Sequence, residues 1–157
     1  MREILLLSGP NLDLLGERSP EIYGAATLAS HVAAVRDRAG TCGLGVRHLQ
    51  SNFEGDLIEA VHGARSSAAA IIINAGALTH SSWALADALA TFDGPKIEVH
   101  LSNPAAREPF RHLSTLAGVV NGSVAGLGAL GYLLAVDAVA HLLGPDATTN
   151  ATSDPTA

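Results

Sequence analysis

Apolar and polar positions alternate in blocks along this chain. Short apolar runs, typical of buried strands, precede longer segments with apolar residues every three or four positions, typical of helices. The runs predict strands at residues 4–7, 45–49, 70–73, 97–101 and 118–120. The helical spacing predicts helices that begin after Thr27, after Asp56 and at Ser81 or Ser82, and a last helix over residues 127–143. Such alternation, with nearly continuous apolar strands, predicts an α/β fold with a five-stranded parallel sheet and helices on both faces.

The length and composition predict one domain that associates with copies of itself and does not bind nucleic acid. Of 157 residues, we expect 1–144 to form a single catalytic domain and the small, polar segment 145–157 to be a disordered C-terminal tail. Hydrophobic residues make up 48% and charged residues 15%, so apolar surface is expected to be buried between subunits. The net charge of -6 argues against nucleic-acid binding.

Cysteine content and apolar segments bear on the compartment. A single cysteine, Cys42, allows no internal disulfide and is consistent with a reducing cytoplasm. The apolar run near the N-terminus is too short for a signal peptide. The longer apolar stretch 124–143 contains Asp137 and His141, which favours a buried helix over a membrane span. We therefore expect a cytoplasmic protein with no membrane partner.

Two charged or titratable residues interrupt the apolar run 97–101. Glu98 and His100 are two positions apart, so on a strand both side chains point to the same face. A carboxylate and an imidazole inside a sheet are costly unless they serve each other or a ligand. The sequence therefore predicts an acid–base pair, with Arg107 and Arg111 following as donors suited to an anionic, hydroxylated small molecule.

Polar residues also follow the other predicted strands. Asn11 comes after the first strand, Asn74 ends the third, and His100 and Ser102 end the fourth. Because ligands of such sheets bind beyond the carboxyl ends of the strands, we expect these residues to gather at one rim.

The loop after the first strand is longer than usual for a strand-to-helix connection and is a candidate lid. It carries Arg18 and Tyr23 between Gly16 and Gly24, which could act as hinges. A tyrosine in such a loop commonly serves packing alone. A neighbouring arginine, however, favours the ionised form of a phenol.

The remaining candidates have plain structural interpretations beside the functional ones. His80 could cap a helix or contact a ligand, and Asp87 could lie on a solvated helix face. A zinc site built from His80, His100 and His112 is conceivable, but their spacing matches no common zinc motif. His31, His48 and His62 are interpreted as surface residues, and Trp83 as a packing or interface residue.

Several blocks of the chain together resemble type II 3-dehydroquinate dehydratase, also called type II dehydroquinase. They read G-P-N-L-x-L-L-G-x-R-x-P-x-x-Y-G from Gly9, Q-S-N-x-E-G-x-L-I from Gln50, N-A-G-A-L-T-H-x-S from Asn74, I-E-V-H-L-S-N-x-x-A-R-E-x-F-R from Ile97 and G-L-G-x-x-G-Y-L-L-A from Gly126. The resemblance implies a flavodoxin-like fold and a homo-dodecamer built from trimers. It also implies conversion of 3-dehydroquinate to 3-dehydroshikimate, by anti elimination of water through an enolate, with no cofactor, metal or Schiff base. Such an enzyme serves the shikimate pathway of aromatic amino acid biosynthesis, or quinate breakdown.

The resemblance also implies roles for individual residues. Tyr23 would remove a proton beside the ketone, and Arg18 and Arg107 would hold it as phenolate, since an ordinary phenol, with a pKa of about 10, is protonated at neutral pH. Asn11 would stabilise the enolate through a water, and His100, oriented by Glu98, would protonate the departing hydroxyl. The substrate-binding residues would be Asn74, Ser102 and the backbone of Leu101 for the carboxylate, His80 and Arg111 for the ring hydroxyls, and Asp87 reaching a neighbouring subunit's site.

Two positions depart from the family pattern: Asp13 stands where a second asparagine is common, and Ala86 where an arginine often precedes the aspartate. Three other kinds of protein remain alternatives. A flavodoxin-like electron carrier would need a hydroxyl-rich phosphate loop after the first strand, where this chain has Pro10 and leucines. A receiver domain would need aspartate where Asn74 ends the third strand. A homologue that binds without catalysis would retain the fold but lack chemical residues, and all of those expected are present.

Overall fold

The protein is built on one parallel sheet. The structure, a computed structural model, describes residues 1–145. Its strands are β1 (Glu3–Ser8), β2 (Gly45–Gln50), β3 (Ala70–Asn74), β4 (Lys96–His100) and β5 (Gly122–Ala125). All neighbouring strands are parallel, in the order β2-β1-β3-β4-β5, which is the flavodoxin-like order. The predicted fold class is confirmed.

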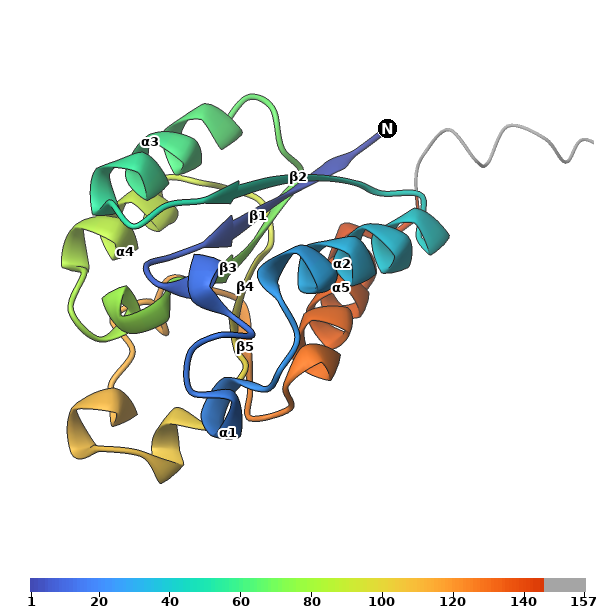
Figure 1. Ribbon diagram of the computed structural model, residues 1–157. Coiled ribbons are helices and arrows are strands. Elements are labelled where there is room, and N and C mark those ends of the chain that lie inside the picture. Colours follow the sequence, from blue (N-terminus) through green and yellow to red (C-terminus); the bar gives the residue numbers. More distant parts are fainter. Residues whose placement is uncertain (146–157) are drawn as a thin grey trace, which may run out of the picture.

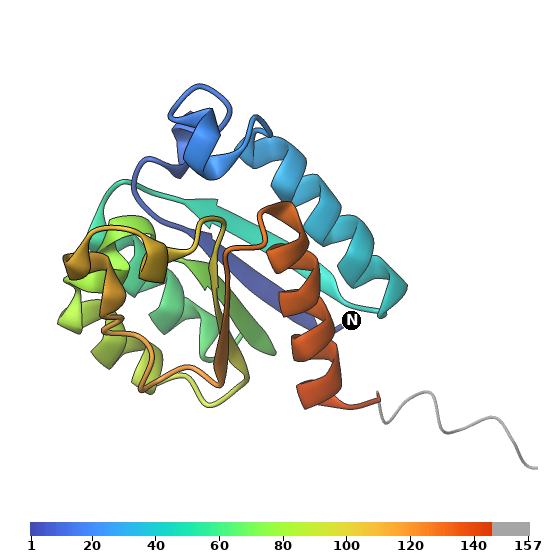
Figure 2. The same ribbon diagram turned by 90° about the horizontal axis from the view of Figure 1, so that it is seen from below.

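Four longer helices cover the two faces of the sheet (Figure 1). Helices α2 (Leu28–Thr41) and α5 (Ala129–Leu143) lie on one face, and α3 (Glu54–Ala64) and α4 (Trp83–Ala90) on the other. Short helical segments follow three of the strands at their carboxyl ends, and Figure 2 displays them from below. These segments are η1 (Leu12–Leu14) and α1 (Pro20–Tyr23) after β1, η2 (Gly76–His80) after β3, and η3 (Pro104–Ala106) and η4 (Pro109–His112) after β4.

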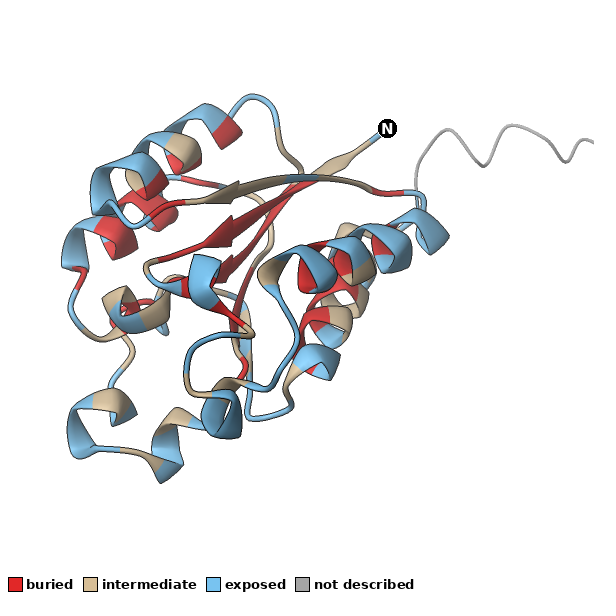
Figure 3. Ribbon diagram, in the orientation of Figure 1, coloured by how far each residue is buried: buried red, intermediate tan, exposed pale blue. Residues whose placement is uncertain are grey.

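The core consists of two apolar layers, one on each side of the sheet. Alternate residues of a strand enter different layers, so Ile4 and Leu6 pack toward α2 and α5 while Leu5 and Leu7 pack toward α3 and α4. Figure 3 shows buried residues on the strands and on the helix sides that face them. Each large side chain buried in this way contributes about 1.5–3 kcal/mol, so the sheet forms a rigid base for the loops at its edge.

Two of the predicted helix starts are confirmed, and one is wrong. The hydroxyl of Thr27 accepts the amide of Ser30, and that of Ser82 accepts the amide of Leu85, as helix caps do. Asp56 is not a cap, because α3 begins two residues earlier at Glu54. Its carboxylate instead accepts a hydrogen bond from the Ser51 hydroxyl at 2.6 Å, within the first turn of the helix, where a negative charge is favourable.

The fifth strand lies later than expected. Residues 118–120 form a turn, in which the amides of Val119 and Val120 donate to the carbonyl of Leu116, and β5 begins at Gly122. Val119 and Val120 are apolar because they pack against the layer under α3 and α4. The apolar run therefore marked a partly buried turn rather than a strand.

The histidine predictions are only partly right. His62 is exposed, as expected, but His48 is half-buried and its Nε2 lies 3.0 Å from the Ser8 hydroxyl. His31 is 4% exposed, because α5 packs beside α2 and places the Tyr132 ring 5.5 Å from its own. Burial lowers the pKa of His31 from its ordinary value, since the charged form loses water.

The last helix begins at Ala129, two residues after the predicted start. Apart from Pro145, the segment predicted to be disordered, 145–157, lies outside the described residues. Among residues 1–145, no helix combines the length and the apolar character needed to cross a bilayer.

Candidate active site

A cavity opens at the carboxyl end of the sheet, between the loops that follow β1, β3 and β4. Its position follows from the strand order, because the chain leaves β1 toward β2 and later returns on the other side to form β3. Every predicted site residue except Glu98 and Asp87 lines this cavity. The lining residues are Pro10, Asn11, Leu12, Leu15, Arg18, Tyr23, Asn74, Gly76, Ala77, His80, His100, Leu101, Ser102, Pro104, Arg107 and Arg111.

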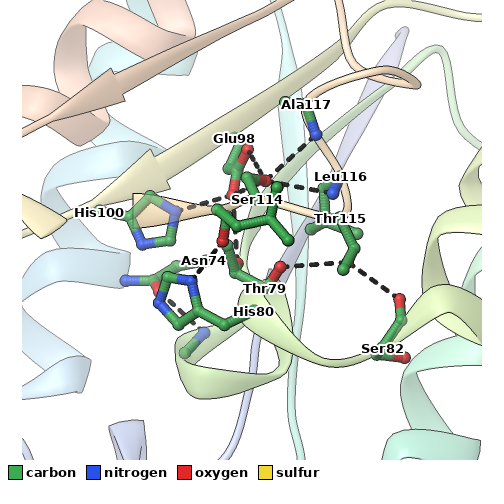
Figure 4. Close-up of polar contacts among 12 residues, drawn as sticks. Asn74, Thr79, His80, Ser82, Glu98, His100, Ser114, Thr115, Leu116 and Ala117 are labelled. Carbon is green, nitrogen blue, oxygen red and sulfur yellow. Dashed lines mark hydrogen bonds and ion pairs between the residues drawn. The ribbon is translucent and has the colours of Figure 1, made fainter. Parts of the chain in front are cut away.

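Glu98 and His100 form the pair that the strand period predicts. Nε2 of His100 lies 2.8 Å from Oε1 of Glu98, and the Glu98 side chain is 2% exposed (Figure 4). Glu98 lies behind the cavity wall, so only the imidazole reaches the cavity. Since Nε2 faces a carboxylate, it carries a proton, and the other ring nitrogen, Nδ1, remains for a ligand.

Two hydroxyls hold the Glu98 carboxylate from the other side. The hydroxyl of Thr79 donates to Oε1 at 3.1 Å, and that of Ser114 lies 3.0 Å from both carboxylate oxygens. Because the Ser114 oxygen already accepts the amides of Leu116 and Ala117, its hydrogen must point to Glu98 (Figure 4).

These donors decide the charge state of Glu98. Burial acts against the carboxylate, but the hydrogen bond and charge of His100, with the hydrogen bonds of Ser114 and Thr79, outweigh it. They hold the pKa of Glu98 below its ordinary value. The pair is therefore a buried, ionised carboxylate that is hydrogen-bonded to the His100 imidazole.

Two guanidinium groups lie over the ring of Tyr23, which also lines the cavity. Nη1 of Arg107 donates to the Tyr23 oxygen at 3.1 Å, and Cζ of Arg107 and of Arg18 lie 5.3 and 5.4 Å from the ring centroid. Gly16 and Gly24 on either side have positive φ of 90° and 83°, which lets the loop fold back over the cavity. The phenol of Tyr23 therefore lies at the cavity wall, with one guanidinium hydrogen-bonded to its oxygen and a second over its ring.

Further donors surround the space between Tyr23 and His100. Nη1 of Arg107 also donates to the hydroxyl of Ser102 at 3.2 Å. Arg111 is oriented by Glu108, whose carboxylate accepts from Nε at 2.6 Å. The amide nitrogen of Asn74 donates to the buried Tyr132 hydroxyl at 3.2 Å, and its oxygen accepts from the Gly76 amide. Cations and amides in this arrangement suit an anion that bears hydroxyl groups.

Of the two remaining predicted ligand contacts, His80 lines the cavity and Asp87 does not. The His80 ring lies 6.4 Å from that of His100, and its Nδ1 lies 2.7 Å from the carbonyl oxygen of Leu113. Asp87 is exposed on α4 and does not line the cavity. In a single chain, therefore, Asp87 has no part in the site.

The residues that support the site were not identified from the sequence. Thr79, Ser114 and Tyr132 touch site residues but lie behind them, and nothing in their local pattern distinguishes them from ordinary packing. Tyr132 is a partial exception, because its phenol stands in a largely apolar helix whose other polar residues are Asp137 and His141, and it is 2% exposed. Over the described part of the chain, no three His, Cys, Asp or Glu side chains gather in a way that could bind a metal ion, so the zinc alternative has no such cluster to rest on.

Comparison with known proteins assigns this site to a family. The family model for dehydroquinase class II matches residues 2–140. The chain belongs to the class II dehydroquinase family. It is 51% identical over 146 residues to a 3-dehydroquinate dehydratase of Ruegeria pomeroyi, covering 93% of this chain and 98% of that protein. It is 52% identical over 147 residues to one of Xylella fastidiosa strain M23, covering 93% of this chain and 99% of that protein.

Solved structures of class II dehydroquinases have the same fold. The type II dehydroquinase of Propionibacterium acnes matches with a TM-score of 0.85 at 40% identity, over 90% of this chain and 97% of that one. The type II dehydroquinase of Butyrivibrio crossotus matches with a TM-score of 0.85 at 40% identity, over 88% and 97%. The residues matched by the family model, 2–140, include all the strands and every residue that lines the cavity.

Proposed function

We propose that this class II dehydroquinase converts 3-dehydroquinate to 3-dehydroshikimate and water. One observation carries the proposal: Tyr23 and His100 line the same cavity. The Arg107 cation lies beside Tyr23, whose reactive form is an anion, and the Glu98 anion lies beside His100, whose reactive form is a cation. A base beside guanidinium and an acid beside carboxylate, separated by space for a substrate, are what an elimination requires. The names of the relatives supply the substrate.

The proposed reaction begins at the carbon beside the ketone. The Tyr23 phenolate takes a proton from that carbon, and the electron pair moves to the ketone oxygen to form an enolate. Asn11 lies on the cavity wall and orients a water toward this oxygen, a kind of stabilisation whose loss costs about a hundredfold or more in rate.

The second step releases water. The enolate electrons return to form the carbon–carbon double bond, the bond to the hydroxyl breaks, and the His100 imidazolium gives that hydroxyl its proton. Tyr23 then holds the proton taken from carbon, and transfer of one proton to His100 through solvent restores the starting state. Glu98 stabilises the imidazolium throughout, and anti geometry follows if base and acid act from opposite faces of the ring.

The donors of the cavity are proposed to bind the rest of the substrate. Asn74, Ser102 and the backbone of Leu101 take the carboxylate, and His80 and Arg111 take ring hydroxyls. The reaction requires no cofactor, since the base and the acid are side chains and the enolate is stabilised by a water that Asn11 orients.

The direct test is an ultraviolet assay with 3-dehydroquinate, because the product contains a conjugated double bond that absorbs. We expect turnover that persists after chelator and borohydride treatment. Tyr23→Phe should reduce kcat about a thousandfold or more while circular dichroism and melting stay unchanged. Wild-type protein that binds 3-dehydroquinate without turning it over would refute the enzyme assignment, and near-normal activity in Tyr23→Phe would remove Tyr23 from its role.

A matched pair of histidine variants tests the acid. His100→Gln should lose most of the activity, whereas His62→Gln, on the exposed side of α3, should retain it. Equal activities of the two variants would contradict the proposed role of His100.

We further propose a homo-dodecamer of trimers in the cytoplasm. Trp83, 65% exposed, and Asp87 lie one turn apart on α4, so one helix face offers an aromatic anchor and the carboxylate proposed to reach the neighbouring site. Ala86, at the departing position, is 4% exposed and packs inward instead. Light scattering should give about twelve times the chain mass of 16.0 kDa. A monomer with full activity would contradict both the assembly and the role of Asp87.

A further inference from the structure

The backbone at Asn11 adopts a conformation that non-glycine residues avoid. Among the described residues, only Asn11, with φ 68°, and Ser19, with φ 41°, have positive φ without being glycine. Asparagine tolerates this region better than most residues, but it remains unfavourable. Such a backbone persists only where its surroundings hold it, and it often marks a functional position.

A side-chain clamp from the neighbouring strand holds this backbone. Oδ1 of Asn52 accepts the amide of Asn11 at 2.9 Å. The amide nitrogen of Gln50, the last residue of β2, donates both to Oδ1 of Asn52 at 3.2 Å and to the carbonyl of Gly9 at 3.3 Å. The turn that begins at Gly9 is therefore held at the Gly9 carbonyl and at the Asn11 amide by two residues at the end of β2.

The other side of the turn rests on β3. The amide of Gly9 donates to the carbonyl of Asn74 at 2.8 Å, and a Cβ at Gly9 would lie 2.3 Å from the carbonyl oxygen of Ala75. The turn thus has a wall on one side and the clamp on the other. The wall prevents the turn from moving toward β3. The clamp, together with the hydrogen bond from Gly9 to Asn74, opposes movement the other way.

The clamp has no evident task in building helix α3. The start of that helix is served by Ser51, whose hydroxyl accepts the amide of Phe53 and donates to Asp56. Asn52 is exposed, and its side-chain oxygen bonds to the turn at Asn11.

We propose that Gln50 and Asn52 are positioning residues that aim the Asn11 side chain into the cavity. The φ of Asn11 sets the direction of its Cα–Cβ bond, and its side chain makes no capping hydrogen bond that would hold it otherwise. If Asn11 relaxed to negative φ, its side-chain amide would turn away from the developing enolate. The proposal rests on the function proposed above, in which Asn11 serves that enolate. It gives a physical role to the block Q-S-N, which the reaction scheme leaves without one.

The test compares three variants of the full-length protein in the ultraviolet assay. Asn52→Ala should lower kcat about tenfold with KM within twofold, because aim rather than substrate affinity is lost. Asn52→Asp keeps an oxygen that accepts the Asn11 amide and should restore kcat to within about threefold of wild type. Asn121→Ala is the control, because the Asn121 oxygen likewise accepts a backbone amide, that of Lys96, at the far end of β4. It should leave kcat unchanged.

A double-variant cycle ties the effect to Asn11. In an Asn11→Ala background, Asn52→Ala should change kcat less than twofold, since there is no side chain left to aim. Unchanged kcat in Asn52→Ala, a loss confined to KM, or equal losses with and without Asn11 would each overturn the positioning role while leaving the dehydratase intact. Absence of turnover in the wild type would instead refute the proposed function, and this role with it.

Discussion

Replacing Glu98 by glutamine removes one buried charge and almost no volume. The glutamine oxygen can occupy the place of Oε1 and accept from His100 and Thr79. Its amide nitrogen would then face the Ser114 oxygen, whose lone pairs already accept two backbone amides. The variant should fold with a modest loss of stability, about 1–3 kcal/mol for one poorly satisfied buried group.

The larger effect should be on catalysis. With Nε2 and Oε1 2.8 Å apart, the charge centres of the pair lie about 4 Å apart, where opposite charges interact by about 4 kcal/mol at an effective dielectric constant near 20. If roughly half or more of this energy stabilises the imidazolium, its loss is about 2–4 kcal/mol. At about 1.4 kcal/mol per factor of ten, kcat should fall about 30- to 1000-fold near neutral pH.

The assay can separate this mechanism from general damage. KM should change only a few-fold, because Glu98 does not line the cavity, and Glu59→Gln on the exposed side of α3 should retain wild-type kcat. A folded Glu98→Gln protein with kcat within threefold of wild type would refute the reasoning that a buried carboxylate sustains the acid.

The same substitution has a signature in stability against pH. The pKa of Glu98 is held below its ordinary value in the folded state, so the folded protein binds fewer protons than the unfolded chain between the two pKa values. The stabilisation that the ionised Glu98 carboxylate provides is present above about pH 4.5 and is lost as the pH falls through the pKa of Glu98 in the folded state. Acidification should therefore destabilise the wild type more than Glu98→Gln, and the free energies of unfolding should converge at low pH. Parallel curves would contradict the pairing.

Two other predictions concern single groups at the core of the domain. Burial raises the pKa of Tyr132 to about 12, although the hydrogen bonds of Asn74 and Ser8 partly offset this effect. The folded state therefore keeps a proton that the unfolded chain loses near pH 10. Stability should fall by at most about 3 kcal/mol between pH 10 and 12, a loss that denaturant titrations should find missing in Tyr132→Phe; equal losses in both proteins would contradict the burial argument. Gly9→Ala should cost about 1–3 kcal/mol or more and lower activity, because its Cβ would meet a backbone oxygen at 2.3 Å. The control Gly63→Ala, where nothing lies within 4 Å of the new Cβ, should melt at or above the wild-type temperature.

Local patterns predicted the parts of the fold that depend on neighbours along the chain. The apolar runs identified four of the five strands, and the strand period placed Glu98 and His100 on one face, because side-chain direction alternates in any strand. The prediction of a strand at 118–120 was wrong because a partly buried turn, like a strand, can place apolar side chains against the core. His31 misled for a similar reason: its exposure depends on α5, about a hundred residues later in the chain.

Three features could be identified from the amino-acid sequence: the succession of strands and helices along the chain, the polar residues at the strand ends and, through the blocks of similarity, the family. The side chains that support those polar residues became evident from the folded structure. Ser114 and Thr79 hold Glu98, Tyr132 holds Asn74, and Asn52 holds the backbone of Asn11. These contacts join residues 16 to 58 positions apart. No local pattern encodes such contacts, because they exist only once a parallel sheet has brought the carboxyl ends of separate strands to one edge.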